Sequence, residues 1–148
     1  METSNLKQKI EQIIDAVTSL VPSYMEDPID SKINDGNVSL CIVDEQANVY
    51  GKLFGTDKNR SRRTFQVAWT KASQVWITGM ATGEYEKKVF NGEIDDKIYG
   101  ISKPDFIGWE GGLPIVLNDG TRLSIGFSGF RGFIDIDIVK KALKIVEA

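Results

Sequence analysis

Two kinds of hydrophobic pattern alternate along the chain, and each predicts a different kind of element. Over residues 6–20, apolar side chains recur every three or four positions. This spacing predicts an amphipathic helix that begins with Thr3 or Ser4 as its N-cap and stops at Pro22. The polar stretch over residues 23–36 has no such period, so we predict a long connecting loop there.

Three more helices are predicted further along the chain. The second helix ends at Gly79 and should bury one face, whose members are Phe65, Ala68, Trp69, Ala72, Val75 and Trp76. Thr82 is predicted to cap a short third helix that ends at Asn91-Gly92. Asp135 is predicted to cap the closing helix.

Two pairs of apolar, β-branched runs lie between these helices. Residues 37–44 and 48–54 predict an antiparallel hairpin. Residues 111–117 and 121–129 predict another, because the turn Asn118-Asp119-Gly120 joins them. Since the strands come in pairs separated by helices, the order predicts an α+β fold with an antiparallel sheet rather than a doubly wound one.

Composition narrows the class of protein. The 148 residues are 41% hydrophobic and 26% charged, which predicts a single domain over residues 1–148. With 18 Lys+Arg against 21 Asp+Glu, the net charge is −3, so we expect neither nucleic acid nor a membrane as a partner. A lone cysteine, Cys41, cannot form an internal disulfide, and we therefore expect a reducing compartment, the cytoplasm.

The chain contains no histidine. This excludes Ser-His-Asp and Cys-His nucleophilic chemistry, and with it every metal site that needs an imidazole ligand. An acid or base would have to be an Asp, Glu, Lys, Tyr or Cys with a shifted pKa. We expect no metal-ligating residues.

A series of short motifs in a fixed order carries a resemblance to a known family. The motifs are Val43-Asp44, Lys71-Ala72, Gly111-Gly112-Leu113-Pro114-Ile115, Asp119-Gly120, Ile125-Gly126-Phe127-Ser128-Gly129 and Asp135. Over residues 5–147 the chain resembles the GlcG/HbpS family of haem-binding or haem-degrading domains, which includes the C-terminal domain of PduO-type proteins. The resemblance implies a profilin-like, five-stranded antiparallel sheet flanked by helices. It also implies homo-oligomers, and haem or another tetrapyrrole as a ligand.

The chain departs from that family in three places. Residues 45–48 form a turn without the glycine common there, and the loop over residues 23–36 is longer than usual. The third departure is the missing histidine, so haem iron would need Tyr, Met or Cys as its axial ligand, or binding by packing and propionate contacts alone. Tyr24 and Met25 are candidates, whereas Cys41 lies mid-strand and is expected in the core.

The paired glycines Gly111 and Gly112 are the leading candidate for a ligand site. Successive glycines let backbone N–H groups turn toward an anion, although the same pair could simply permit a turn before a strand. Trp109 and Glu110 precede them. Tucked against Trp109 and Ile107, Glu110 would have a raised pKa and could act as a catalytic acid or base; a solvated loop glutamate is the alternative.

Basic and aromatic residues of the second helix allow two interpretations each. Arg63 and Lys71 could bind an acidic ligand, but pairing with the acidic residues of the loop over residues 23–36 is the favoured interpretation of this basic run. For Trp69 and Trp76, core packing is favoured over a wall for an aromatic ligand.

Two functions from different classes follow. The first is a small-molecule-binding protein whose ligand is haem, another tetrapyrrole or an acidic aromatic metabolite. The alternative is a cofactor-free enzyme for a small carbonyl or carboxylate metabolite. In that enzyme Glu110 would move a proton, and the amides of Gly111 and Gly112 would form an oxyanion hole.

Overall fold

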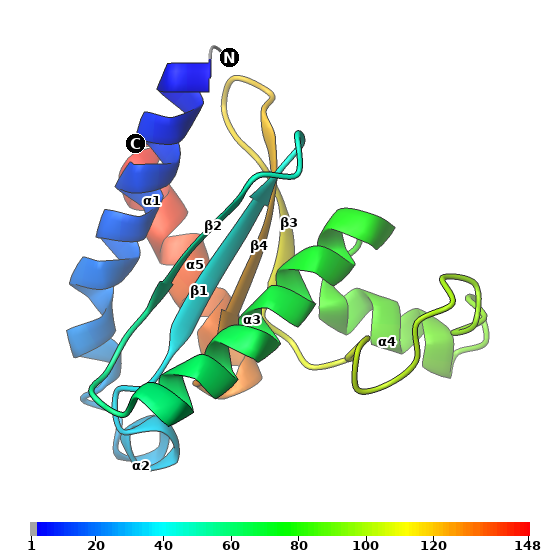
Figure 1. Ribbon diagram of the computed structural model, residues 1–148, viewed down its shortest axis with the longest axis horizontal. Coiled ribbons are helices and arrows are strands. Elements are labelled where there is room, and N and C mark those ends of the chain that lie inside the picture. Colours follow the sequence, from blue (N-terminus) through cyan, green and yellow to red (C-terminus); the bar gives the residue numbers. More distant parts are fainter. Residues whose placement is uncertain (1–2) are drawn as a thin grey trace.

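The computed structural model describes residues 3–148 as a sheet with helices on both faces (Figure 1). The helices are α1 (Thr3–Tyr24), α2 (Pro28–Asn34), α3 (Lys58–Thr78), α4 (Thr82–Phe90) and α5 (Gly132–Val146). The strands are β1 (Ser39–Asp44), β2 (Val49–Leu53), β3 (Gly112–Val116) and β4 (Arg122–Ser128). Both hairpins predicted from the sequence are confirmed, and so is the α+β class.

The four strands form one antiparallel sheet in the order β2-β1-β4-β3. In its centre, Ile42 of β1 pairs with Ile125 of β4, so the two hairpins meet along their inner strands. The resemblance implied five strands, and this count is wrong for the residues that the structure describes. Asp44 closes the turn after β1, because its Oδ1 accepts the N–H groups of Gln46 and Asn48, both at 2.9 Å.

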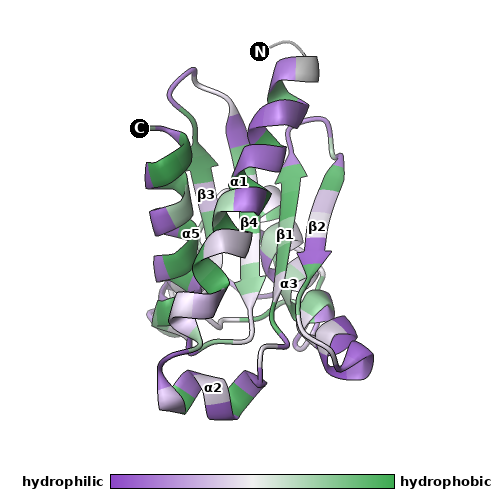
Figure 2. Cartoon of the chain, turned by 90° about the vertical axis from the view of Figure 1, so that its left-hand side faces the viewer, coloured by the Kyte–Doolittle hydropathy of each residue, from purple (hydrophilic) through white to green (hydrophobic). Residues whose placement is uncertain are grey.

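The two faces of the sheet carry cores of different size. Alternate side chains such as Leu40 and Ile42 belong to the main apolar core with α1 and α5, which cross that face in Figure 2. Cys41 and Val43 point the other way and pack against Ala68 and Ala72 of α3. The expectation that Cys41 is a core residue is confirmed, and burial raises the pKa of its thiol to about 12.

Helix α3 lies so close to the sheet that bulky side chains do not fit between them. A Cβ at Gly126 of β4 would collide with the backbone of Ala68. The residues that α3 buries are therefore mostly small or narrow: Ser61, Ala68, Lys71, Ala72, Gln74 and Val75. The prediction that Trp69 and Trp76 pack in the core is wrong, since both indoles lie at the flank of the helix and are exposed.

Several predicted boundaries also differ. Helix α1 continues past Pro22 to Tyr24, and the predicted loop contains α2, which Asp27 caps by accepting the N–H of Ile29. Neither Thr82 nor Asp135 caps a helix; each uses its side chain for a long-range contact instead. Within residues 3–148, every helix is too short or too polar to span a membrane.

Candidate functional site

An open groove runs between α3 and the segment that leads into β3. It has a volume of about 770 Å³, within the usual range for small-molecule sites. We call it the indole groove, because Trp69 and Trp109 stand on its two walls. Its lining consists of Gln66, Val67, Trp69, Thr70 and Ser73 of α3, Glu86 of α4, and Lys103, Pro104, Asp105, Ile107, Gly108 and Trp109.

Two buried polar side chains hold the Trp109 wall of the groove in place. Gln74 of α3 is fully buried; its Nε2 donates to the carbonyl of Ile107, and its Oε1 accepts the N–H of Ile107, both at 2.8 Å. Thr82 Oγ1 donates to the carbonyl of Trp109 at 2.6 Å. Sequence analysis missed both roles; the one signal for Gln74 was a polar amide within an apolar helical stripe. The wall is thus fastened to α3 and α4 through its backbone.

The two indoles of the groove are unusually accessible for tryptophans. Trp69 is 43% exposed and Trp109 is 67% exposed. Behind Trp109, the segment is anchored by the buried ring of Phe106, which packs edge-on against Tyr85 at a centroid distance of 5.6 Å. An anchored backbone therefore leaves much of the Trp109 indole accessible to solvent, and accessible indoles are surfaces on which planar ligands can stack.

One ion pair lies in the groove. Lys103 Nζ is 2.9 Å from Glu86 Oε1, and this hydrogen bond raises the pKa of the lysine. Glu86 approaches closely because Gly108 has no side chain in its path. Its second oxygen, Oε2, is buried without a hydrogen-bond partner. Asp105 adds a further carboxylate, so the lining as a whole does not favour anions.

The paired glycines lie beside the groove but are packed against protein. Gly111 has a φ of +121°, and a Cβ there would lie 2.6 Å from the Phe127 carbonyl and 2.7 Å from Lys71 Nζ. The N–H of Gly112 donates to Thr82 Oγ1 at 3.1 Å. Thr82 therefore already occupies one of the two amides that an oxyanion hole would use.

Glu110 does not have the setting that the sequence predicted. Its side chain is exposed rather than tucked against Trp109 and Ile107, and it lines a separate hollow with Gly83 and Gly112. Its role as an acid or base stays a prediction.

Lys71 forms a deeply buried ion pair with Asp135. Their side chains are 3% and 2% exposed, and Lys71 Nζ lies 3.2 Å from Asp135 Oδ2 and 2.8 Å from the Phe127 carbonyl. Asp135 Oδ1 accepts the N–H of Phe130 at 2.9 Å. Burial raises the pKa of Asp135 to about 7 despite the opposing pull of Lys71 and the Phe130 N–H, and burial lowers the pKa of Lys71.

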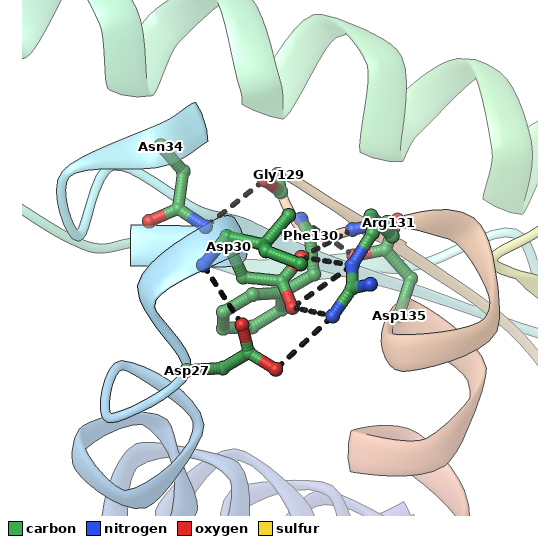
Figure 3. Close-up of polar contacts among 8 residues, drawn as sticks. Asp27, Asp30, Asn34, Gly129, Phe130, Arg131 and Asp135 are labelled. Atoms are coloured by element: carbon green, nitrogen blue, oxygen red, sulfur yellow. Dashed lines mark hydrogen bonds and ion pairs between the residues drawn. The ribbon is translucent and has the colours of Figure 1, made fainter. Parts of the chain in front are cut away.

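A second set of charges, built around the buried Asp30 with Arg131 and Asp27 partly exposed, fastens α2 to the turn between β4 and α5 (Figure 3). Arg131 Nη2 lies 3.0 Å from Asp30 Oδ2 and 3.1 Å from Asp27 Oδ2, and the Arg131 N–H donates to Asp30 Oδ1 at 2.8 Å. Asp30 is fully buried; burial alone would raise its pKa, but the Arg131 bonds outweigh this and lower it. Together with Lys71 and Asp135, these three residues form what we call the buried charge cluster.

The structure thus separates the predicted ligand-binding residues. Trp109 lies in the indole groove, and Lys71 lies in the buried charge cluster beneath Gly111. Arg63 is exposed in a small hollow on α3, eight residues or about 12 Å of helix away from Lys71. The favoured pairing of the basic run with the acidic residues of the loop over residues 23–36 is wrong for the described residues, because Asp27 and Asp30 pair with Arg131, and Lys71 pairs with Asp135.

The remaining candidates for an iron ligand are engaged elsewhere. The hydroxyl of Tyr24 donates to Asp137, and Met25 packs on the main core. Over the part of the chain that the structure describes, no three His, Cys, Asp or Glu residues are grouped as metal ligands.

These features define a small α+β protein with an accessible aromatic groove on the α3 face of its sheet. A family model described as "Haem degrading protein HbpS-like" matches residues 30–144. The chain therefore belongs to the HbpS-like family, as the sequence resemblance predicted. A comparison with curated proteins finds no match.

Three solved structures share the fold at low sequence identity. The protein ORFY of Klebsiella pneumoniae has a TM-score of 0.68 at 19% identity, covering 95% of this chain and 89% of its own. A PduOC:heme complex has a TM-score of 0.62 at 18% identity, with coverages of 97% and 93%. A double mutant of Streptomyces reticuli HbpS has a TM-score of 0.57 at 19% identity, with coverages of 91% and 84%.

Proposed function

We propose that this protein binds a planar tetrapyrrole-type metabolite in the indole groove. The observation that carries this proposal is the pair of exposed indoles, Trp69 and Trp109, on opposite walls of one groove. Burying exposed aromatic surface against a flat ring contributes hydrophobic and stacking free energy in the same contact. The groove is also large enough for such a ring.

The relatives support the class of ligand. The family model describes a haem-degrading protein, and one structural neighbour is a complex with heme. Haem is a flat aromatic macrocycle, which matches the shape of the surface that the two indoles offer. We include a homo-oligomer in a reducing compartment in the proposal, because a second subunit over the open groove would enclose a ligand more fully.

The acidic character expected of the ligand receives less support than its flatness. That expectation rested on Arg63 and Lys71, and neither side chain lines the groove. The enzyme alternative needs Glu110 and the amides of Gly111 and Gly112 to act on one atom. Because the N–H of Gly112 already donates to Thr82 Oγ1, the observations favour a ligand-binding protein over this enzyme.

A titration with hemin tests the proposal. We expect stoichiometric uptake with quenching of tryptophan fluorescence, because Trp69 and Trp109 would contact the ring. Trp69→Ala should weaken binding about tenfold, since a lost aromatic contact costs about 1 to 1.5 kcal/mol. Trp76→Ala is the matched control: Trp76 is 48% exposed on the same helix but lines a different hollow. Equal losses in the two variants, or no uptake by the wild type, would contradict the proposal.

A further inference from the structure

The lining of the indole groove contains none of the side chains that normally bind haem iron. Axial ligands to haem come from His, Cys, Met or Tyr. The whole chain has no histidine, and the groove lining includes no cysteine, methionine or tyrosine. The donor set of this site therefore does not fit the iron of haem, although its shape fits the ring.

The two carboxylates of the groove do not replace those ligands. Glu86 Oε1 is held by Lys103, and Glu86 Oε2 is buried with Gly108 packed beside it. Asp105 is exposed, where water hydrates its carboxylate.

The tyrosine of the adjoining hollow is also closed off. Tyr85 lines the adjoining hollow, but its hydroxyl oxygen is buried beneath neighbouring atoms and has no accessible surface for a ligand. Cys41 lies on the sheet under α3, where burial raises the pKa of its thiol and keeps it protonated.

We propose that the indole groove recognises the flat face of a macrocycle without coordinating a metal, so that a metal-free porphyrin binds as tightly as haem. This inference rests on the proposed function and specifies its ligand class. The binding free energy comes from stacking on Trp69 and Trp109 and from burial of apolar ring surface. Charge contributes little, because Lys103 is already paired with Glu86 and Asp105 opposes an anionic ligand.

Hemin and protoporphyrin IX form the decisive pair of probes, because they carry the same side chains and differ only in iron. We expect their dissociation constants, measured by tryptophan quenching at low micromolar concentration, to agree within about threefold. Both should change by less than about threefold between 50 and 500 mM NaCl, as expected for binding without a dominant ionic contact. Coordination of the iron by a protein side chain would shift the Soret band of hemin. We expect bound hemin to show no such shift.

The Ser73→His variant calibrates the comparison. Ser73 lines the groove one turn after Trp69, so an imidazole there supplies the iron ligand that the chain lacks. In this variant hemin should bind at least tenfold more tightly than protoporphyrin IX and show a shifted Soret band.

The outcomes separate the inference from the proposed function. Equal binding of both probes by the wild type supports both. A wild-type preference of tenfold or more for hemin, with a shifted Soret band, overturns metal-independent recognition but leaves a tetrapyrrole site. Failure of both probes to bind overturns the proposed function itself.

Discussion

The buried charge cluster, on which Gly111 packs, and the indole groove, whose lining includes Trp109, differ in which side chains they expose to water. In the cluster, charged side chains such as Lys71 and Asp30 are buried and fully paired. In the groove, large aromatic side chains are left in contact with water. Burying charge and exposing tryptophan both cost stability, but only the second leaves a surface free for a ligand.

The difference teaches which feature identifies a ligand site in this fold. The charged groups of the cluster are engaged with one another: Lys71 binds Asp135 and the Phe127 carbonyl, and Arg131 binds Asp27 and Asp30. Trp69 and Trp109 have no such partner for their exposed faces. Charged residues therefore hold the protein together here, and aromatic residues are left to bind.

Removing one member of the buried ion pair should have the largest effect. We expect Lys71→Met to lower the free energy of unfolding by about 3 to 5 kcal/mol, because it leaves Asp135 buried without its counter-charge. The double variant Lys71→Met/Asp135→Asn should recover most of this loss. It removes both charges but keeps an acceptor for the Phe130 N–H. Urea unfolding with unchanged slopes measures both values.

An exposed ion pair provides the control for that experiment. Lys88 and Glu84 lie 3.4 Å apart on the surface of α4. Lys88→Met should change stability by less than about 0.5 kcal/mol. A similarly small loss for Lys71→Met would show that the buried pair is not structural.

The pH dependence of stability should report the same pair, with a smaller effect for each pH unit. The pKa of Asp135 is raised by burial to about 7, whereas in the unfolded chain an aspartate titrates near about 3.9. Between these values the folded state holds a proton that the unfolded state has released. Stability should therefore fall as the pH rises from about 4 to about 7, by at most about 1.4 kcal/mol per pH unit.

The double variant isolates this contribution, because it lacks both titrating groups of the pair. Urea unfolding at pH 4.5, 5.5 and 6.5 should give a flatter profile for Lys71→Met/Asp135→Asn than for the wild type. Asp30 does not interfere: its pKa is lowered by Arg131, so its contribution is lost only below this window. Parallel profiles for the two proteins would contradict the assignment.

How far the sequence predicts this structure depends on whether a feature is local. The hairpin of β1 and β2 and the helical spacing of α3 follow from neighbouring residues, and both predictions are confirmed. Periodicity identified the apolar side chains of α3, but not which of them face the sheet and which lie at the flank of the helix. The close approach at Gly126, which turns Trp69 to the flank, depends on residues more than fifty positions away.

The candidate site was predicted in part for the same reason. Trp109 was selected as a neighbour of the glycine pair, and it does lie in the groove. Trp69 was assigned to the core, and Gln74 was missed because its partner, Ile107, is brought near only by folding. For Lys71 the sequence allowed an acidic ligand or, as favoured, an acidic partner in the loop over residues 23–36, but its partner Asp135 lies 64 positions away and is brought near only by folding.

The groove tryptophans should contribute less to stability than the buried ion pair of Lys71 and Asp135. We expect Trp109→Ala, which removes a side chain that is 67% exposed, to cost less than about 1 kcal/mol. Trp69→Ala should cost about 1 to 2 kcal/mol, because more of its indole is buried. Phe127→Ala is the core reference and should cost about 3 to 5 kcal/mol, since Phe127 is fully buried. If Trp109→Ala instead destabilised the protein as much as Phe127→Ala, this indole would be a structural residue, and its exposed face would no longer indicate a binding surface.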